Sequence, residues 1–215
     1  MTRAAFADRA AAGEELGRSL IGMALVDPLV LGLARGGVVV AAAVAKVLDA
    51  PLDVLVVRKL GHPRRPELGL GALAEDGEPV YDDAGLAAAG LSRGDLAAVV
   101  TAERAECRRR VLTYRRGRAA SAVQGRTVVV VDDGVATGVT ARAALVAVLR
   151  LGAARVLLAA PVASRPAVEL LCDDAEVVTP LVPRHLGAVS RFYDRFAQTS
   201  DAEVLELLRA ARPPT

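Results

Sequence analysis

Two aspartates, Asp132 and Asp133, follow a run of four valines and precede a loop of small residues, GVATG, at 134–138. Such an apolar run is typical of a buried strand, and the carboxyl end of a parallel strand is where ligands bind. The loop and the helix expected after it would offer backbone N–H groups to a phosphate dianion. Thr137 and Thr140 add hydroxyl donors. Because carboxylates repel phosphate but accept bonds from hydroxyl groups, we interpret the stretch as a sugar-phosphate site.

Three other phosphate-binding motifs do not fit this stretch. A nucleotide P-loop needs a lysine before its Ser or Thr, and no lysine follows Lys59 in the chain. A dinucleotide fingerprint needs GxGxxG after the first strand, and the chain has none. A phosphoacceptor receiver domain would place its acids early and a lysine late, whereas this chain has its acid pair late. With these three motifs excluded, we keep the interpretation of the stretch as a sugar-phosphate site.

Two further turns are expected near the acid pair because they also follow predicted strands. They are ARGG at 34–37 and RKLG at 58–61. Each has a simpler explanation: ARGG as a strand-to-helix turn, RKLG as a solvated strand end, and DDGVATG as a helix N-terminus with acids placed favourably against the dipole. If all three turns meet, they form one site that contains both acidic and basic side chains.

The elements that must position these residues alternate between strands and helices. The strands are apolar throughout, which predicts an α/β fold with a mostly parallel central sheet and helices on both faces, in a single domain over 1–215. Residues 61–79, rich in Gly and Pro, predict a long connection with a short strand around 70–74; connections of that length are usually functional. We expect strands near 29–33, 53–57, 127–131, 155–161 and 176–180, and helices near 3–20, 38–48, 92–115 with Ser92 as N-cap, 139–151, 165–172 and 200–211.

Composition narrows the class of protein. The net charge is only +2 and Trp is absent, so no nucleic-acid partner is expected. The arginines between 108 and 118 are interpreted as the solvated face of a helix. Cys107 and Cys172 lack the spacing of a disulfide framework or zinc site. The chain has no apolar run of the roughly 20 residues that span a bilayer, and its first residues do not resemble a signal peptide. We therefore expect a cytoplasmic protein with no membrane partner.

The stretch VVVVDDGVATGVT resembles the phosphoribosyl pyrophosphate (PRPP) signature of type I phosphoribosyltransferases: a hydrophobic strand, two acids and a small-residue loop ending in TGxT. ARGG resembles the pyrophosphate-binding turn of that family, and 61–79 resembles its flexible loop. A small hood subdomain is expected at 181–200, with help from the N-terminal helix. The whole chain is similar to a group of bacterial proteins of about this length that are described by the family name alone.

The resemblance implies a transferase that binds PRPP with Mg²⁺, passes the phosphoribosyl group to an unidentified nitrogenous small molecule and releases pyrophosphate. Mg²⁺ would bind mainly through PRPP oxygens and water rather than through protein ligands. A homodimer is the assembly that the family implies. The implied catalytic residues are Asp132, Asp133, Arg35 and Lys59. In the implied PRPP site, Asp132 and Asp133 hold the ribose 2- and 3-hydroxyls; Gly134, Val135, Ala136, Thr137, Gly138 and Thr140 bind the 5-phosphate; and Arg35, Gly36, Gly37, Arg58 and Lys59 face pyrophosphate.

The acceptor is left open. Ala136 stands where the 6-oxopurine enzymes of the family have an aspartate, which disfavours hypoxanthine and guanine. Phe192 or Tyr193 could stack on an acceptor ring, although Phe192 and Phe196 also fit as core residues at i, i+4. His185 or Arg184 could contact an acceptor, or lie on a surface loop, and His62 could contact pyrophosphate.

Two other functions use the same pocket. One is a non-catalytic regulator that binds PRPP or ribose phosphate. The other is a sugar-phosphate hydrolase or phosphorylase, which would consume PRPP without an acceptor.

Overall fold

The computed structural model describes residues 5–75 and 77–211. Arg3 and Ala4, with which the predicted N-terminal helix begins, lie outside these residues, as does residue 76 of the predicted 61–79 connection. Within them the first helix, α1 (Arg9–Leu20), starts later than expected, because the Asp8 carboxylate accepts a bond from the Ala11 N–H at 3.0 Å and caps the helix there.

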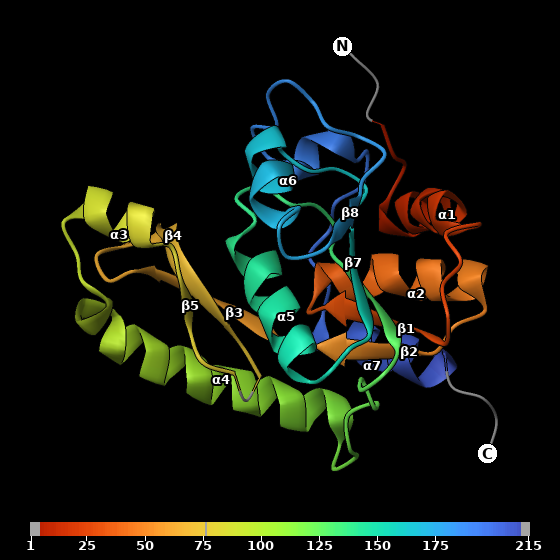
Figure 1. Ribbon diagram of the computed structural model, residues 1–215, viewed down its shortest axis with the longest axis horizontal. Coiled ribbons are helices and arrows are strands. Elements are labelled where there is room, and N and C mark those ends of the chain that lie inside the picture. The colour runs from red at the N-terminus through yellow and green to blue at the C-terminus, as the bar shows by residue number, and fades with distance from the viewer. Residues whose placement is uncertain (1–4, 76, 212–215) are drawn as a thin grey trace.

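A five-stranded sheet forms the centre of the molecule, and every neighbouring pair of its strands is parallel. This confirms the predicted α/β class. Helices α1 and α2 cover one face of the sheet, and α5 and α6 cover the other (Figure 1). The strand order is β2 (Leu52–Leu55), β1 (Pro28–Leu33), β6 (Thr127–Val131), β7 (Arg155–Ala159) and β8 (Glu176–Val178), and the helices are α2 (Gly36–Leu48), α5 (Val139–Arg150) and α6 (Arg165–Leu171).

The four valines of β6 show why an uninterrupted apolar strand was needed. Val128 and Val130 pack toward α5, whereas Val129 and Val131 pack toward α1 and α2. Successive side chains of a strand point to opposite faces, so a strand covered on both faces must be apolar at every position. All four valines are fully buried, which holds the residues that follow β6 in one place.

A second, three-stranded antiparallel sheet makes a hairpin lobe beside α5, as Figure 1 shows on its left. One face of the hairpin packs on α5, and the other packs on α4. We use the name hairpin lobe for β3 (Val57–His62), β4 (Arg65–Ala74), β5 (Val80–Tyr81), α3 (Asp83–Ala89), the 3₁₀ helix η1 (Arg93–Leu96) and α4 (Ala97–Arg115).

The prediction of a long irregular connection over 61–79 is wrong for most of that segment, because β4 is ten residues long. The expected strand 53–57 is likewise two strands, which separate at Val56. Pro66 is accommodated because the pairing of β3 with β4 is irregular between Gly61 and His62, and a bulge does not require every N–H of the ladder. Glycines and prolines therefore mark a bulged hairpin here.

Helix α3 was not predicted, although its ends carry ordinary signals. The Asp82 carboxylate accepts a bond from the Gly85 N–H at 2.9 Å, and Gly90 ends the helix in the left-handed conformation. The predicted start at Ser92 is confirmed, but for η1 rather than directly for α4; the Ser92 N–H and hydroxyl both bond to Asp95.

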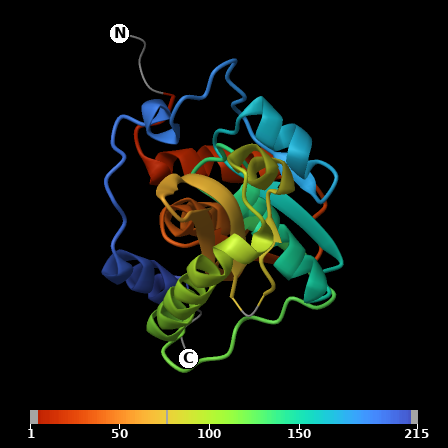
Figure 2. The same cartoon turned by 90° about the vertical axis from the view of Figure 1, so that its left-hand side faces the viewer.

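The segment 181–200, expected as a hood, is mostly irregular and contains the 3₁₀ helix η2 (Val189–Phe192). It lies beside the N-terminal residues: the Phe6 N–H bonds to the Phe192 carbonyl at 2.9 Å, and the Asp194 N–H bonds to the Phe6 carbonyl at 2.9 Å. Phe6, expected on the N-terminal helix, is therefore part of this contact. Figure 2 shows the blue chain descending from this region to α7 (Asp201–Ala210), which packs near α2, β2 and α4. No helix among the described residues is long and apolar enough to cross a membrane.

Candidate functional site

Asp132 and Asp133 lie at the carboxyl end of β6, the middle strand of the sheet. The Asp132 N–H bonds to the Ala159 carbonyl at 3.2 Å, so the chain leaves the sheet only after this residue. The Asp133 N–H then bonds to Oδ1 of Asp132 at 2.9 Å. Both side chains are partly buried, and the sheet holds them rigidly next to each other.

Arg9 of α1 is the direct partner of Asp133. Its Nε donates to Oδ2 of Asp133 at 2.7 Å, and its Nη1 donates to the Ala197 carbonyl at 2.7 Å. The guanidinium lies 3.7 Å from the ring centroid of Phe196, which is cation–π geometry. The sequence interpretation missed Arg9, because nothing in an amphipathic helix 124 residues away predicts which strand end its arginine reaches.

The surroundings of the acid pair raise the pKa of both aspartates. Burial raises the pKa of Asp132 well above its usual value, and the adjacent Asp133 charge raises it further. Burial also raises the pKa of Asp133, but Arg9 opposes that rise. Each carboxylate keeps one oxygen, Oδ2 of Asp132 and Oδ1 of Asp133, that makes no hydrogen bond within the described part of the chain. These two oxygens are the acceptors that a ligand can use.

The loop 134–138 joins the acids to α5. Val135 is buried, its N–H bonds to the Val162 carbonyl at 2.9 Å, and its carbonyl accepts from the Ser164 N–H at 2.9 Å. Val135 therefore anchors the loop. The sequence interpretation had placed its N–H among the phosphate donors, but in the structure that N–H is already bonded to the Val162 carbonyl. Ala136 and Thr137 are exposed, and neither their N–H groups nor that of Gly138 bonds to any described residue.

Helix α5 begins at this loop without a side-chain cap, with Gly138 in the left-handed conformation at its N-cap. The N–H groups of its first turn are thus unmatched by the usual side-chain acceptor, and the positive end of the helix dipole faces the loop. Thr140, in the first turn, is partly buried. The start of α5 thus has the free N–H groups and the positive dipole end at which the sequence interpretation expects a phosphate.

The ARGG turn brings a second uncapped helix end to the same place. α2 starts at Gly36 with Arg35 as its N-cap and no side-chain acceptor, and the peptide between Ala34 and Arg35 is cis. A Cβ on Gly36 would lie 2.0 Å from Oδ2 of Asp133, and one on Gly37 would lie 2.7 Å from the Val131 carbonyl. Only glycine allows the turn and the acid pair to approach this closely.

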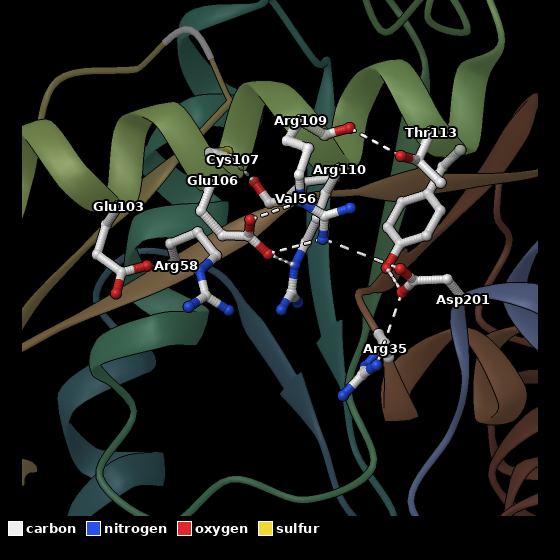
Figure 3. Close-up of polar contacts among 11 residues, drawn as sticks. Arg35, Val56, Arg58, Glu103, Glu106, Cys107, Arg109, Arg110, Thr113 and Asp201 are labelled. Atoms are coloured by element: carbon white, nitrogen blue, oxygen red, sulfur yellow. Dashed lines mark hydrogen bonds and ion pairs between the residues drawn. The ribbon is translucent and has the colours of Figure 1, made fainter.

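The Arg35 side chain leaves the turn toward α7 and α4. Its Nη1 lies 3.6 Å from Oδ1 of Asp201, which also accepts the Tyr114 hydroxyl at 2.7 Å. Figure 3 shows the guanidinium groups of Arg35, Arg58 and Arg110 on the same side of α4.

Arg58 and Arg110 are each anchored through Nε alone. Nε of Arg58 bonds to Glu103 at 2.7 Å, and Nε of Arg110 bonds to Glu106 at 2.8 Å. Their terminal nitrogens have no partner among the described residues, and only 25% of the Arg58 side chain and 14% of the Arg110 side chain is exposed. Arg110, interpreted from sequence as part of a solvated helix face, is therefore half-buried, with its guanidinium on the side of α4 on which Arg35 also lies (Figure 3).

Lys59 does not join this group. Its Nζ donates to the Glu67 carbonyl at 2.7 Å on the hairpin, and the side chain is exposed. Because Lys59 follows Arg58 within β3, the two side chains point to opposite faces of the hairpin. The expectation that both would add charge at one point is wrong for the conformation described. His62 is buried and accepts the Arg64 N–H at 3.0 Å in the hairpin turn.

Tyr193, predicted as a stacking surface for the acceptor, lies instead in a small aromatic cluster. It is buried, and its ring centroid is 5.5 Å from that of Phe6 and 5.0 Å from that of Phe196. Its hydroxyl donates to the Asp133 carbonyl at 2.5 Å, and burial raises its pKa well above the usual value. Phe192 packs against this cluster, whereas Arg184 and His185 are exposed.

The hood also touches the loop. A Cβ on Gly134 would lie 2.4 Å from Cγ1 of Val189. Within residues 5–75 and 77–211, no group of three or more His, Cys, Asp or Glu side chains is arranged to hold a metal ion.

Comparison with known protein families agrees with this geometry, in which two uncapped helix ends surround a carboxylate pair. The family model described as the phosphoribosyl transferase domain matches residues 11–180. The chain therefore belongs to the type I phosphoribosyltransferase family, as its signature stretch predicted.

Two relatives from Mycobacterium tuberculosis, strains CDC 1551 and H37Rv, carry the name "Putative phosphoribosyl transferase". Each is 44% identical over 207 residues, which cover 96% of this chain and 47% of the relative. The chain thus spans about half the length of the curated relatives it matches.

Among solved structures, TT1426 from Thermus thermophilus superposes with a TM-score of 0.82 at 44% identity, covering 97% of this chain and 99% of that one. AQ2163 from Aquifex aeolicus has a TM-score of 0.52 at 13% identity, covering 86% of this chain and 85% of that one, and shows likeness of fold alone.

The raised pKa of Asp132 predicts an unusual pH dependence of stability. Between the unfolded value near 4 and the raised folded value, the folded state binds more protons than the unfolded state, so this residue lowers stability as pH rises. Asp132→Asn removes the titration and keeps the Oδ1 acceptor. The variant should therefore gain stability over wild type between pH 4 and pH 7, measured by denaturant unfolding.

Glu106→Gln is the matched control, because folding lowers the pKa of Glu106 whereas it raises the pKa of Asp132. Arg109 and Arg110 lower the pKa of Glu106 to about 2, so the stability that the ionised group contributes is present above its ordinary pKa and is lost only as pH falls toward 2. The difference between wild type and this variant should stay constant from pH 5 to pH 7. A constant difference for Asp132→Asn over the same range would contradict the assignment.

Proposed function

We propose that the protein transfers the 5-phosphoribosyl group of PRPP to a nitrogen atom of a small-molecule acceptor and releases pyrophosphate. The observation that carries the proposal is the partly buried acid pair, flanked by the uncapped N-termini of α2 and α5. One oxygen on each carboxylate has no hydrogen-bond partner among the described residues. PRPP has the complementary order of groups: a phosphate at one end, vicinal hydroxyls in the middle and pyrophosphate at the other end.

In this proposal the ribose hydroxyls donate to the acid pair. Oδ2 of Asp132 and Oδ1 of Asp133 are the two oxygens without partners in the described chain, one for each hydroxyl. Hydrogen bonds to charged acceptors are about twice as strong as neutral ones, so the pair would fix the ring in one orientation.

The 5-phosphate would occupy the N-terminus of α5. The N–H groups of Ala136, Thr137 and Gly138 have no partner within residues 5–75 and 77–211, so they can bind it, and the Thr137 and Thr140 hydroxyls add donors. Val135 contributes only by anchoring the loop to the segment after β7.

Pyrophosphate would lie at the N-terminus of α2, against Arg35, Gly36 and Gly37. Arg58 and Arg110 extend this positive region, since their terminal nitrogens are unpaired among the described residues and point to the side on which Arg35 lies (Figure 3). Arginine suits this role because its planar fork binds phosphate oxygens in pairs. Lys59 would reach pyrophosphate only after the hairpin changes conformation.

In this proposal Mg²⁺, a hard cation that takes oxygen ligands and keeps several waters, binds through PRPP oxygens and water rather than directly to the acid pair. Asp132 and Asp133 would hold the ion through the ribose hydroxyls and water. When bound, Mg²⁺ supplies positive charge to the leaving pyrophosphate.

In the proposed reaction the bond between C1 of ribose and the pyrophosphate oxygen breaks, and a bond from the acceptor nitrogen to C1 forms. The electron pair leaves with pyrophosphate, and the nitrogen loses its proton to solvent. Positive charge develops on the ribose ring, so the acid pair would stabilise it from the hydroxyl side while Arg35 and the α2 N-terminus stabilise the leaving group.

The threonines test the phosphate position. Replacing Thr137 and Thr140 together by Val removes two hydroxyl donors while keeping the shape of both side chains. We expect the Kd for ribose 5-phosphate to rise about tenfold or more, the usual value of one or two such bonds. Calorimetry measures this. Thr101→Val, at an exposed position of α4, is the control and should leave the Kd unchanged.

Arg110 tests the pyrophosphate position. Arg110→Gln should weaken binding of magnesium pyrophosphate about tenfold and leave ribose 5-phosphate binding within twofold. Arg108→Gln, at an exposed position of the same helix, should change neither constant. Equal effects of the two variants would mean that Arg110 acts only through the overall charge of α4.

The reaction itself is tested by incubating the protein with PRPP, Mg²⁺ and a panel of purine, pyrimidine and pyridine-carboxylate acceptors. Pyrophosphate release that depends on one acceptor, and that Asp132→Asn and Asp133→Asn abolish, is the expected result. Binding of PRPP without turnover on any acceptor would instead indicate a regulator. PRPP consumption without an acceptor would indicate a hydrolase.

A further inference from the structure

Arg9 has more anchors than an ordinary surface arginine. It bonds to Asp133 and to the Ala197 carbonyl, each at 2.7 Å, and lies 3.7 Å over Phe196. Only 12% of its side chain is exposed. Ordering a long arginine side chain costs rotamer entropy, and here three contacts to one guanidinium hold it in a single position.

The same region holds the main chain of Asp133. The Tyr193 hydroxyl donates to the Asp133 carbonyl at 2.5 Å, and Val189 lies against Gly134. Arg9 therefore completes a clamp in which the hood holds Asp133 by its backbone and α1 holds it by its carboxylate.

The clamp is joined to the N-terminal segment by backbone bonds. The Phe6 N–H bonds to the Phe192 carbonyl, the Asp194 N–H to the Phe6 carbonyl, and the Arg195 N–H to the Ala7 carbonyl, at 2.9, 2.9 and 3.0 Å. The hood and the residues that lead into α1 are thus one packed unit, and Arg9 is the point where that unit meets the acid pair.

We propose that Arg9 is a positioning residue for ribose, which holds Oδ2 of Asp133 so that Oδ1 alone faces the ligand, and which ties this orientation to the packed hood. This inference rests on the proposed function of the acid pair. It assigns Arg9 to the ribose side of the site, although the residue comes from a helix that the signature stretch does not include.

The charges around Asp133 explain why an arginine is needed. Asp132, Arg9 and the Tyr193 hydroxyl face it. Without Arg9, two adjacent carboxylates in a partly buried site would tend to hold one proton between them. One hydroxyl acceptor of the ribose site would then become a donor, and the ligand would lose a partner.

Three variants distinguish two roles for Arg9: orienting the Asp133 carboxylate, or merely attaching α1 to the rest of the protein. Arg9→Met removes the charge and both hydrogen bonds. Arg9→Lys keeps a cation but cannot reach Asp133 and the Ala197 carbonyl from one planar group. Arg195→Met is the matched control, because Arg195 links the hood to α1 through Asp8 at 2.5 Å, is 75% exposed and does not contact the acid pair.

The first measurement needs no ligand. Carboxyl ¹³C NMR follows the titration of Asp132 and Asp133 in each variant. In Arg9→Met, Asp133 should titrate at a higher pH than in wild type, whereas Arg9→Lys and Arg195→Met should leave its titration close to wild type. An unchanged Asp133 titration in Arg9→Met would overturn the inference.

The second measurement is calorimetric binding of ribose 5-phosphate. Its Kd should rise about tenfold or more in Arg9→Met, rise less in Arg9→Lys, and stay within twofold in Arg195→Met. An equal rise in Arg9→Met and Arg195→Met would show that the arginine only stabilises the hood, and would also overturn the inference. If Arg9→Met does not fold, Arg9→Lys decides: weaker binding with an unchanged Asp133 titration supports positioning, and wild-type binding contradicts it.

The two proposals fail in different ways. If wild-type protein binds neither ribose 5-phosphate nor PRPP, the proposed function fails, while the NMR titration still decides whether Arg9 governs Asp133. If wild type binds and the Arg9 variants bind equally well, the proposed function stands and only the role of Arg9 fails.

Discussion

The site depends on one constraint: two adjacent carboxylates stand at the end of a strand that is buried on both faces. β6 lies between β1 and β7, and the bond from the Asp132 N–H to the Ala159 carbonyl keeps the backbone of Asp132 at the carboxyl edge of the sheet. Ionised groups in such a place are costly unless they are paired, and in the described part of the chain Arg9 is paired with Asp133. The remaining carboxylate oxygens can therefore accept hydrogen bonds from hydroxyl groups of a ligand or attract a cation.

The N-termini of two helices, α2 and α5, lie around the acid pair and add partial positive charge on either side of it. α2 and α5 begin without a side-chain cap, as does α4, which continues directly from η1. By contrast, α1, α3, α6 and α7 begin with capping side chains, from Asp8, Asp82, Ser164 and Ser200. Uncapped N-termini carry partial positive charge and free N–H groups. Positive ends on either side of a carboxylate pair form an alternating pattern, which suits a ligand that carries anions at its ends and hydroxyls between them.

The hood and the hairpin lobe were the least predictable parts. The alternation of Leu and Gly through 68–71 is a strand pattern, but the prolines nearby favoured a loop interpretation until the bulge showed how Pro66 is tolerated. Tyr193 looked like a stacking surface because aromatic residues often serve as one. Its burial between Phe6 and Phe196 depends on the N-terminal segment, about 190 residues earlier in the chain, lying beside it.

The sequence by itself determined the parallel sheet, the acid pair, the loop that follows and the family, because these features are local: a strand, a turn and a helix start within 13 residues. Only the tertiary structure decided which distant side chains complete the site. It brought Arg9 to Asp133 and Arg110 to the side of Arg35, sent Lys59 to the other face of the hairpin, and used the Val135 N–H inside the protein. Such pairings follow from how helices pack on a sheet, and periodicity along the chain does not record which residue of one helix meets which strand end.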